Sequence, residues 1–114
     1  MAKTVKQALA ALPEYIRVGA LDVTILRSIP VGDNTNSWGL WDSNREVIWM
    51  NPETASAQRV VEVFTHELLH AIFHIAMIAE TDDEERTVTT LARALADVYR
   101  DNPWYGRWLS TYSA

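Results

Sequence analysis

The sequence contains no cysteine, carries few basic residues and has no long apolar run. Without cysteine, neither a disulfide framework nor a cysteine-ligated zinc site can form. Ten Lys and Arg against 15 Asp and Glu give a formal net charge of −5, which offers no basic patch for nucleic acid. No stretch has the length of a signal-peptide core or a membrane-spanning helix. We therefore expect a soluble, cytoplasmic protein that binds neither nucleic acid nor membrane.

The apolar content is high enough for a real core. Of 114 residues, 48% are hydrophobic and five are Trp, which argues against disorder. This length suits one compact domain, so residues 1–114 are expected to form a single unit.

The hydrophobic pattern predicts both helices and strands. Residues 5–12 predict a short helix, and residues 15–18 and 21–27 predict extended segments around Gly19. Residues 38–41 and 46–50 predict a β-hairpin, with Val47 and Trp49 on one face and Ile48 and Met50 on the other. Residues 86–100 have apolar side chains at helical spacing, and residues 104–112 carry a last apolar stripe that should pack on the core.

The middle of the chain carries the motif His66-Glu67-Leu68-Leu69-His70, which has the form H-E-x-x-H. On a helix, residues four apart lie one above the other, so two imidazoles at this spacing can bind one metal ion. Glu67 lies one step round the helix and can take a proton from a water beside the metal. The motif predicts a zinc (Zn²⁺) site with ligands His66 and His70 and the general base Glu67.

The residues around the motif are apolar nearly all the way round the expected helix. This helix should begin at Asn51-Pro52-Glu53, with Asn51 as N-cap and Thr54 as the alternative cap, and run to about residue 79. A helix that is apolar all round is buried. Burial of two imidazoles and a carboxylate without partners would be costly, and a metal ion is the simplest partner. The context therefore favours a metal site over a purely structural histidine pair.

A hydrolytic zinc site usually has three protein ligands and one open position for water. His74 lies four residues beyond His70, but one straight helix does not easily supply three ligands. His66 and His74 would be about 12 Å apart along its axis. The pattern that uses a further histidine needs a glycine turn, and Phe73 stands at the glycine position. We therefore expect His74 to line the site rather than to bind the metal.

An acid on the following helix is the other candidate for the third ligand. Glu84 is in register with the apolar stripe of that helix, which places it on the expected buried face, and Glu85 lies one step to the side. We favour Glu84, with Glu85 as the alternative. Both could instead form the acidic first turn that helix N-termini prefer.

With the motif, His74, Glu84-Glu85-Arg86-Thr87-Val88 and Asp101-Asn102-Pro103 in view, the chain resembles a known group. It is similar to the minimal gluzincin-type zinc metallopeptidases, particularly small phage- and prophage-encoded ones, which are similar to ImmA/IrrE-type peptidases. The resemblance implies that two histidines and a downstream glutamate bind zinc while the motif glutamate acts as base. It also implies a sheet whose edge strand, here residues 46–50, pairs with an extended peptide.

Together these features predict an α+β, zincin-like fold. A small antiparallel or mixed three-stranded sheet would pack on a buried H-E-x-x-H helix and a following ligand helix. The predicted function is zinc-dependent hydrolysis of peptide bonds in a peptide or protein substrate. The alternative is a metal-stabilised phage regulatory or binding protein without turnover, which would have no need of Glu67. A plain structural domain, which would bind no metal, is a third hypothesis.

Overall fold

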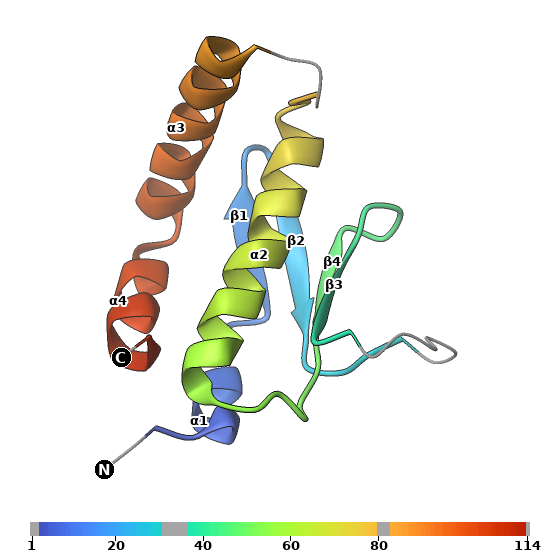
Figure 1. The fold of residues 1–114 in the computed structure, drawn as a ribbon, viewed down its shortest axis with the longest axis vertical. Coiled ribbons are helices and arrows are strands. Elements are labelled where there is room, and N and C mark those ends of the chain that lie inside the picture. Colours follow the sequence, from blue (N-terminus) through green and yellow to red (C-terminus); the bar gives the residue numbers. More distant parts are fainter. Residues whose placement is uncertain (1–2, 31–36, 80–82, 114) are drawn as a thin grey trace.

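The computed structural model describes residues 3–30, 37–79 and 83–113, and within these ranges the fold is α+β, as predicted (Figure 1). Four strands form one sheet, and four helices accompany it. The strands are β1 (Tyr15–Val18), β2 (Leu21–Leu26), β3 (Gly39–Asp42) and β4 (Val47–Met50). The helices are α1 (Val5–Ala10), α2 (Ala57–Ile75), α3 (Glu84–Asp101) and α4 (Pro103–Tyr112).

The sheet is mixed, with the strand order β1-β2-β4-β3. β1 and β2 form an antiparallel hairpin, β3 and β4 form another, and β2 pairs with β4 in parallel. Gly19 turns the first hairpin with a φ of +60°, a conformation that glycine adopts without steric cost. The described sheet therefore has four strands rather than the three predicted, because the two segments around Gly19 pair with each other.

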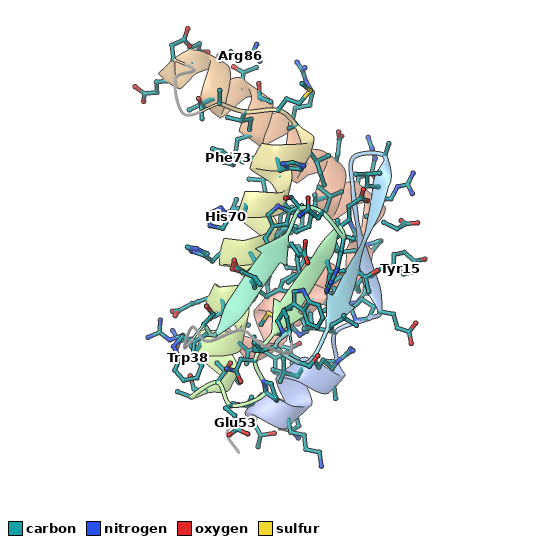
Figure 2. The ribbon with its side chains drawn as sticks, turned by 90° about the vertical axis from the view of Figure 1, so that its right-hand side faces the viewer. Tyr15, Trp38, Glu53, His70, Phe73 and Arg86 are labelled. Carbon is teal, nitrogen blue, oxygen red and sulfur yellow. The ribbon has the colours of Figure 1, made fainter. Side chains whose placement is uncertain are left out.

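Helix α2 lies against one face of the sheet (Figures 1 and 2). Side chains alternate across each strand, so Ile48 and Met50 of β4 are fully buried on one face and Trp49 takes the other, as predicted. Each apolar side chain buried in this way stabilises the fold by about 1.5–3 kcal/mol. The core between sheet and helices includes Ile16, Val23, Ile25, Ile48, Met50, Val60, Phe64, Leu68, Ile72 and Val98.

The start of α2 differs from the prediction. The helix begins at Ala57, with Ser56 as its N-cap, and the Ser56 hydroxyl accepts from the N–H of Arg59 at 3.1 Å. The Asn51 side chain instead accepts from the N–H of Glu53 at 2.8 Å and closes a turn. Asparagine favours such local turns as well as helix caps, and here the turn is adopted. Asn51 as the helix cap was therefore wrong.

The end of α2 comes at Ile75, four residues before the predicted limit. Met77 has a φ of +58°, which is left-handed and ends the helix. The N–H of Met77 donates to the backbone carbonyl of His74 at 3.3 Å, and the N–H of Ile78 donates to the backbone carbonyl of Phe73 at 2.9 Å. This pair of bonds is the Schellman arrangement, which satisfies the last carbonyls of a helix.

Helix α4 completes the core with aromatic side chains. The rings of Trp104, Tyr105 and Trp108 surround Phe64 of α2 at centroid distances of 6.4, 5.9 and 5.3 Å. The predicted packing of residues 104–112 on the core is confirmed. Helix α3 is covered less: of its residues only Val98 is buried. In the part of the chain that the structure describes, no helix combines the length and the apolarity needed to cross a membrane.

Candidate metal centre

His66 and His70 lie one turn apart on an exposed stripe of α2. Their Nε2 atoms are 3.1 Å apart and their ring centroids 4.8 Å apart. The prediction that this helix is buried all round is wrong, because Arg59 and Glu62 share the exposed stripe with both imidazoles. The histidines are therefore not buried polar groups that require a partner. The case for a metal rests on their geometry instead.

That geometry fits two ligands of one zinc ion. Nitrogen ligands of a tetrahedral zinc, each at ~2.0–2.1 Å from the metal, lie about 3.3 Å from one another. The observed Nε2–Nε2 separation of 3.1 Å is close to this value. Two neutral imidazoles can also share a hydrogen bond at this distance, with one Nε2–H donating to the other ring. The arrangement is thus compatible with a metal and with a direct histidine contact.

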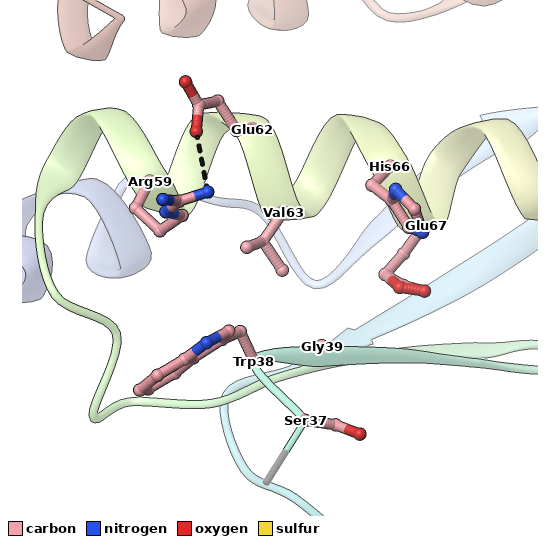
Figure 3. Close-up of a pocket in the computed structure, with 8 residues that line it drawn as sticks. All are labelled: Ser37, Trp38, Gly39, Arg59, Glu62, Val63, His66 and Glu67. Carbon is pink, nitrogen blue, oxygen red and sulfur yellow. Dashed lines mark ion pairs between the residues drawn. The ribbon is translucent and has the colours of Figure 1, made fainter.

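Glu67 lies beside the pair and is buried, with 7% of its surface exposed. Figure 3 shows its side chain directed from α2 toward the strand that carries Gly39. Burial raises the pKa of the Glu67 carboxyl, whereas His66, His70 and a hydrogen bond from the backbone of Trp41 act in the opposite direction. A buried carboxyl of this kind is suited to general-base chemistry.

The ligand atoms of His66, Glu67 and His70 all lie within 4.8 Å of one another. Among the residues that the structure describes, no other histidine, aspartate or glutamate joins this group. The structure therefore brings together the two predicted ligands and the predicted base.

Glu84 and Glu85 lie elsewhere, in the first turn of α3. Both are exposed, so the expectation that Glu84 is on a buried helix face was wrong. The N-cap of this helix is Asp83, whose carboxylate accepts from the N–H of Arg86 at 2.7 Å. Negative charge in a first helical turn interacts favourably with the helix dipole. A third ligand from either glutamate stays a prediction, because neither is part of the group around the two histidines.

His74 is exposed and lies beside Trp41 of β3, with ring centroids 6.0 Å apart. It is not part of the group formed by His66, Glu67 and His70. The residues that line the cavity next to His66 do not include His74, so its expected place at the site stays a prediction.

Strand β3 is an edge of the sheet and contacts α2. Residues 46–50 were expected to provide that edge, and this was wrong, because β4 pairs on one side with β2 and on the other with β3. The parallel pairing of β2 with β4 leaves β3 on the outside. The edge strand beside the motif helix is therefore the first arm of the hairpin, not the second.

The backbone of β3 directs some of its hydrogen-bonding groups to its outer side. The N–H of Asn51 donates to the carbonyl of Trp38 at 2.9 Å, so these two residues form a hydrogen-bonded pair. Hydrogen-bonded and non-hydrogen-bonded pairs alternate in an antiparallel ladder. Gly39 and Trp41 therefore turn their backbone groups away from β4. Within the described ranges, no further strand pairs with that side.

A cavity of about 310 Å³ opens between α2 and the start of β3, next to His66 (Figure 3). Arg59 and Glu62 form an ion pair at 3.3 Å on its helical side. Its lining residues are Ser37, Trp38, Gly39, Arg59, Glu62, Val63, His66 and Glu67. Sequence reasoning did not assign a role to Gly39, although a glycine inside a strand is a signal of close backbone approach.

Comparison of the chain with protein-family models, with curated proteins and with solved structures finds no match.

Proposed function

We propose that this protein is a zinc-dependent metallopeptidase of the minimal gluzincin type. The observation that carries the proposal is the 3.1 Å separation of the His66 and His70 Nε2 atoms beside the buried carboxyl of Glu67. A zincin-like packing and an origin in a phage or prophage are parts of the same proposal, and they rest on the resemblance of the motifs. A cytoplasmic location is proposed with them.

Each residue of the motif has a distinct role in the proposed reaction. His66 and His70 hold the zinc ion through their Nε2 atoms. When bound, zinc supplies a Lewis acid that makes water nucleophilic near neutral pH and polarises a peptide carbonyl. Glu67 accepts the proton of the attacking water and delivers it to the leaving amine. Burial raises the pKa of this carboxyl, which makes its ionised form a stronger base for the first of these transfers.

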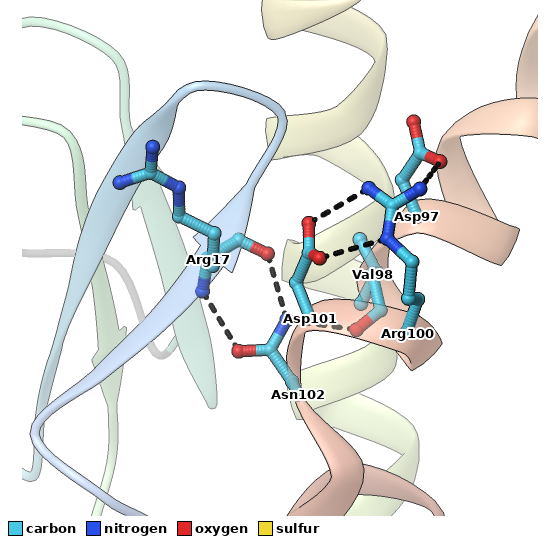
Figure 4. A network of polar contacts seen from close by, with 6 residues as sticks. All are labelled: Arg17, Asp97, Val98, Arg100, Asp101 and Asn102. Carbon is cyan, nitrogen blue, oxygen red and sulfur yellow. Dashed lines mark hydrogen bonds and ion pairs between the residues drawn. The ribbon is translucent and has the colours of Figure 1, made fainter.

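The proposed substrate is an extended peptide that pairs with the outer side of β3. Gly39 directs both of its backbone groups to that side, and Trp41 directs its carbonyl there, since the Trp41 N–H is bonded to Glu67. Main-chain pairing with a sheet edge is a common mode of peptide recognition. At the opposite edge of the sheet, backbone groups of β1 already have a partner, because the Asn102 side chain binds the N–H and the carbonyl of Arg17 (Figure 4). The edge beside the catalytic helix, with which no other described strand pairs, supports peptide binding there.

The second candidate function is a metal-stabilised regulatory or binding protein without turnover. One observation favours it: among the described residues, no third ligand accompanies the two histidines and Glu67. Metal binding and peptide pairing would be retained in such a protein, but no peptide bond would be cleaved.

Zinc content and peptidase activity of four proteins separate these functions. The wild type should bind zinc and cleave an unstructured protein substrate, and His66→Ala should lose both properties. Glu67→Gln should keep its zinc and lose about 10²–10⁴-fold in kcat, because only the base is removed. Glu53→Gln, which changes an exposed carboxylate outside the cavity, should match the wild type.

Bound zinc without cleavage by any of the proteins would support the binding function. Absence of zinc from the wild type after incubation with excess zinc would overturn both functions.

A further inference from the structure

Gly39 of β3 lies close against α2. A Cβ atom at this position would be 2.6 Å from Val63 Cγ1, 3.1 Å from Glu67 Cγ and 3.2 Å from the backbone oxygen of Trp49. Any side chain would therefore collide with the helix on one side and crowd the neighbouring strand on the other. Either the Val63 side chain or the strand would have to shift to accept it.

Lack of room for a side chain, rather than backbone conformation, explains why position 39 is a glycine. Gly19 is the glycine with positive φ among the described residues, so Gly39 has a φ that other residues also adopt. Glycine inside a strand costs roughly 0.5–1 kcal/mol relative to alanine. Gly39 therefore weakens the strand and is not required by its backbone angles. Its role is in the contact with α2.

The contact is made at the turn of α2 that carries the proposed base. Val63 and Glu67 are one turn apart and both face Gly39 (Figure 3). Two residues along the strand, Trp41 turns its backbone away from β4, and this backbone is hydrogen-bonded to the Glu67 carboxyl. The position of the carboxyl thus depends on how closely β3 approaches the helix.

We propose that Gly39 is a positioning residue for Glu67: because it lacks a side chain, β3 approaches α2 closely enough for the Trp41 N–H to hold the carboxylate. This inference rests on the proposed function for its effect on catalysis, but the contact itself does not require turnover. His66 and His70 do not belong to the contact, since both project from the exposed stripe of α2.

The kinetic test uses Gly39→Ala, Val63→Ala and the double variant. Gly39→Ala should lower kcat by about a hundredfold, the loss that ~1 Å of misplacement can cause, while zinc affinity stays that of the wild type. Val63→Ala removes the atom that the new methyl group would meet at 2.6 Å. The double variant should therefore recover most of the kcat of Val63→Ala. Equal loss of kcat in the single and double glycine variants would overturn the inference.

Gly106→Ala is the matched control. A Cβ atom there would be 3.9 Å from the nearest atom of Tyr99, which is an ordinary contact. Its kcat and zinc affinity should equal those of the wild type. A loss of kcat as large as that of Gly39→Ala would show that any added methyl group is harmful, and would contradict a specific role for Gly39.

Hydrogen exchange of the Trp41 amide, measured without zinc, tests the contact independently of activity. The amide should be protected in the wild type and in Gly39→Ala/Val63→Ala, and should exchange faster in Glu67→Ala and in Gly39→Ala. An inactive wild type with this exchange pattern would refute the proposed function and leave the positioning role standing. Slow exchange in Glu67→Ala would refute the positioning role, whatever the activity, and this measurement remains decisive if Gly39→Ala fails to fold.

Discussion

The Asn102 side chain binds both backbone groups of Arg17, a residue 85 positions earlier in the chain (Figure 4). Its Oδ1 accepts from the Arg17 N–H at 2.9 Å, and its Nδ2 donates to the Arg17 carbonyl at 2.8 Å. The same Nδ2 donates to the carbonyl of Val98 at 2.8 Å. One amide therefore takes the place of a neighbouring strand at the outer side of β1 and also fixes the junction of α3 and α4.

Replacement of Asn102 by alanine should strongly destabilise the protein. Asn102 is 4% exposed, and its loss leaves the backbone groups of Arg17 without these partners at a covered edge. Each of the three hydrogen bonds contributes about 0.5–1.5 kcal/mol, so the free energy of unfolding should fall by about 2–4 kcal/mol. Urea unfolding measures this change. Asn44 is exposed in the β3–β4 turn, so in Asn44→Ala the free energy of unfolding should fall by less than ~0.5 kcal/mol. Equal losses in the two variants would show that the Asn102 hydrogen bonds contribute little.

Tyr105 should make stability depend on pH in the alkaline range. The phenol is 2% exposed, and burial raises its pKa to about 12 from an ordinary value of 10.0. Between these values the unfolded chain loses the proton while the folded chain keeps it, so ionisation stabilises the unfolded state. The contribution of this group is complete below pH 10 and is lost as the pH rises toward 12. At ~1.36 kcal/mol per unit the loss amounts to about 2–3 kcal/mol.

Denaturant unfolding of Tyr105→Phe between pH 9 and pH 12 checks this dependence. The excess stability of the wild type over the variant should fall as the pH rises and then change sign, because the loss of about 2–3 kcal/mol exceeds the advantage at neutral pH. At neutral pH the variant should be less stable by about 0.5–1.5 kcal/mol, because the hydroxyl contacts Thr65 Oγ1 at 3.0 Å. A constant difference for Tyr105→Phe across the range would mean that its phenol ionises normally.

Zinc should stabilise the folded chain, because the two imidazoles are held in place only when α2 is formed. At free zinc of 100 times the Kd, the stabilisation is about 2.7 kcal/mol. The Tm should rise with zinc concentration and return to the apo value when a chelator is added. His66→Ala/His70→Ala should show no dependence on zinc. The same rise in that double variant would place the metal outside the proposed centre.

The sequence predicted the elements better than it predicted their exposure. The spacing of His66 and His70 was enough to place two imidazoles on one face of a helix, because helical geometry is local. That face was predicted to be buried, and this was wrong. α2 lies beside β3, the edge strand of the sheet, and the stripe of α2 that carries the two histidines is exposed. Composition alone does not reveal where a neighbouring element ends.

The edge strand was assigned to the wrong arm of the hairpin for a similar reason. Both arms have apolar residues that suit a strand, and the choice between them depends on which arm β2 joins in parallel. This pairing is non-local, with Thr24 opposite Val47, and nothing in either segment specifies it. The contact of Gly39 with Val63 and Glu67 follows from the same arrangement, which is why the sequence indicated a strand but not the role of its glycine.

The third zinc ligand is tested by comparing Glu84→Gln with Glu85→Gln. We predict that Glu84→Gln lowers zinc affinity by about a hundredfold or more and that Glu85→Gln has a much smaller effect. Loss of a group that only hydrogen-bonds to a metal ligand already lowers affinity by up to about a hundredfold, and loss of a ligand should cost at least as much. Both residues lie in the first turn of α3, so binding would require this turn to move toward His66 and His70. Zinc should then slow hydrogen exchange at the start of α3 in the wild type and not in Glu84→Gln.

Two controls separate ligation from ordinary charge effects in this test. Glu62→Gln removes a carboxylate from the same stripe as His66 and should change zinc affinity by about fivefold at most, as expected for ~1 kcal/mol at the surface. Without zinc, the free energy of unfolding should be about 0.3–1 kcal/mol lower in each of Glu84→Gln and Glu85→Gln, because both carboxylates interact favourably with the positive N-terminal end of α3. If zinc affinity falls no further in Glu84→Gln and Glu85→Gln than in Glu62→Gln, Glu84 and Glu85 only stabilise the first turn of α3 and do not bind the metal. The metal would then be held by α2 without α3, and the binding function would become the better account of the protein.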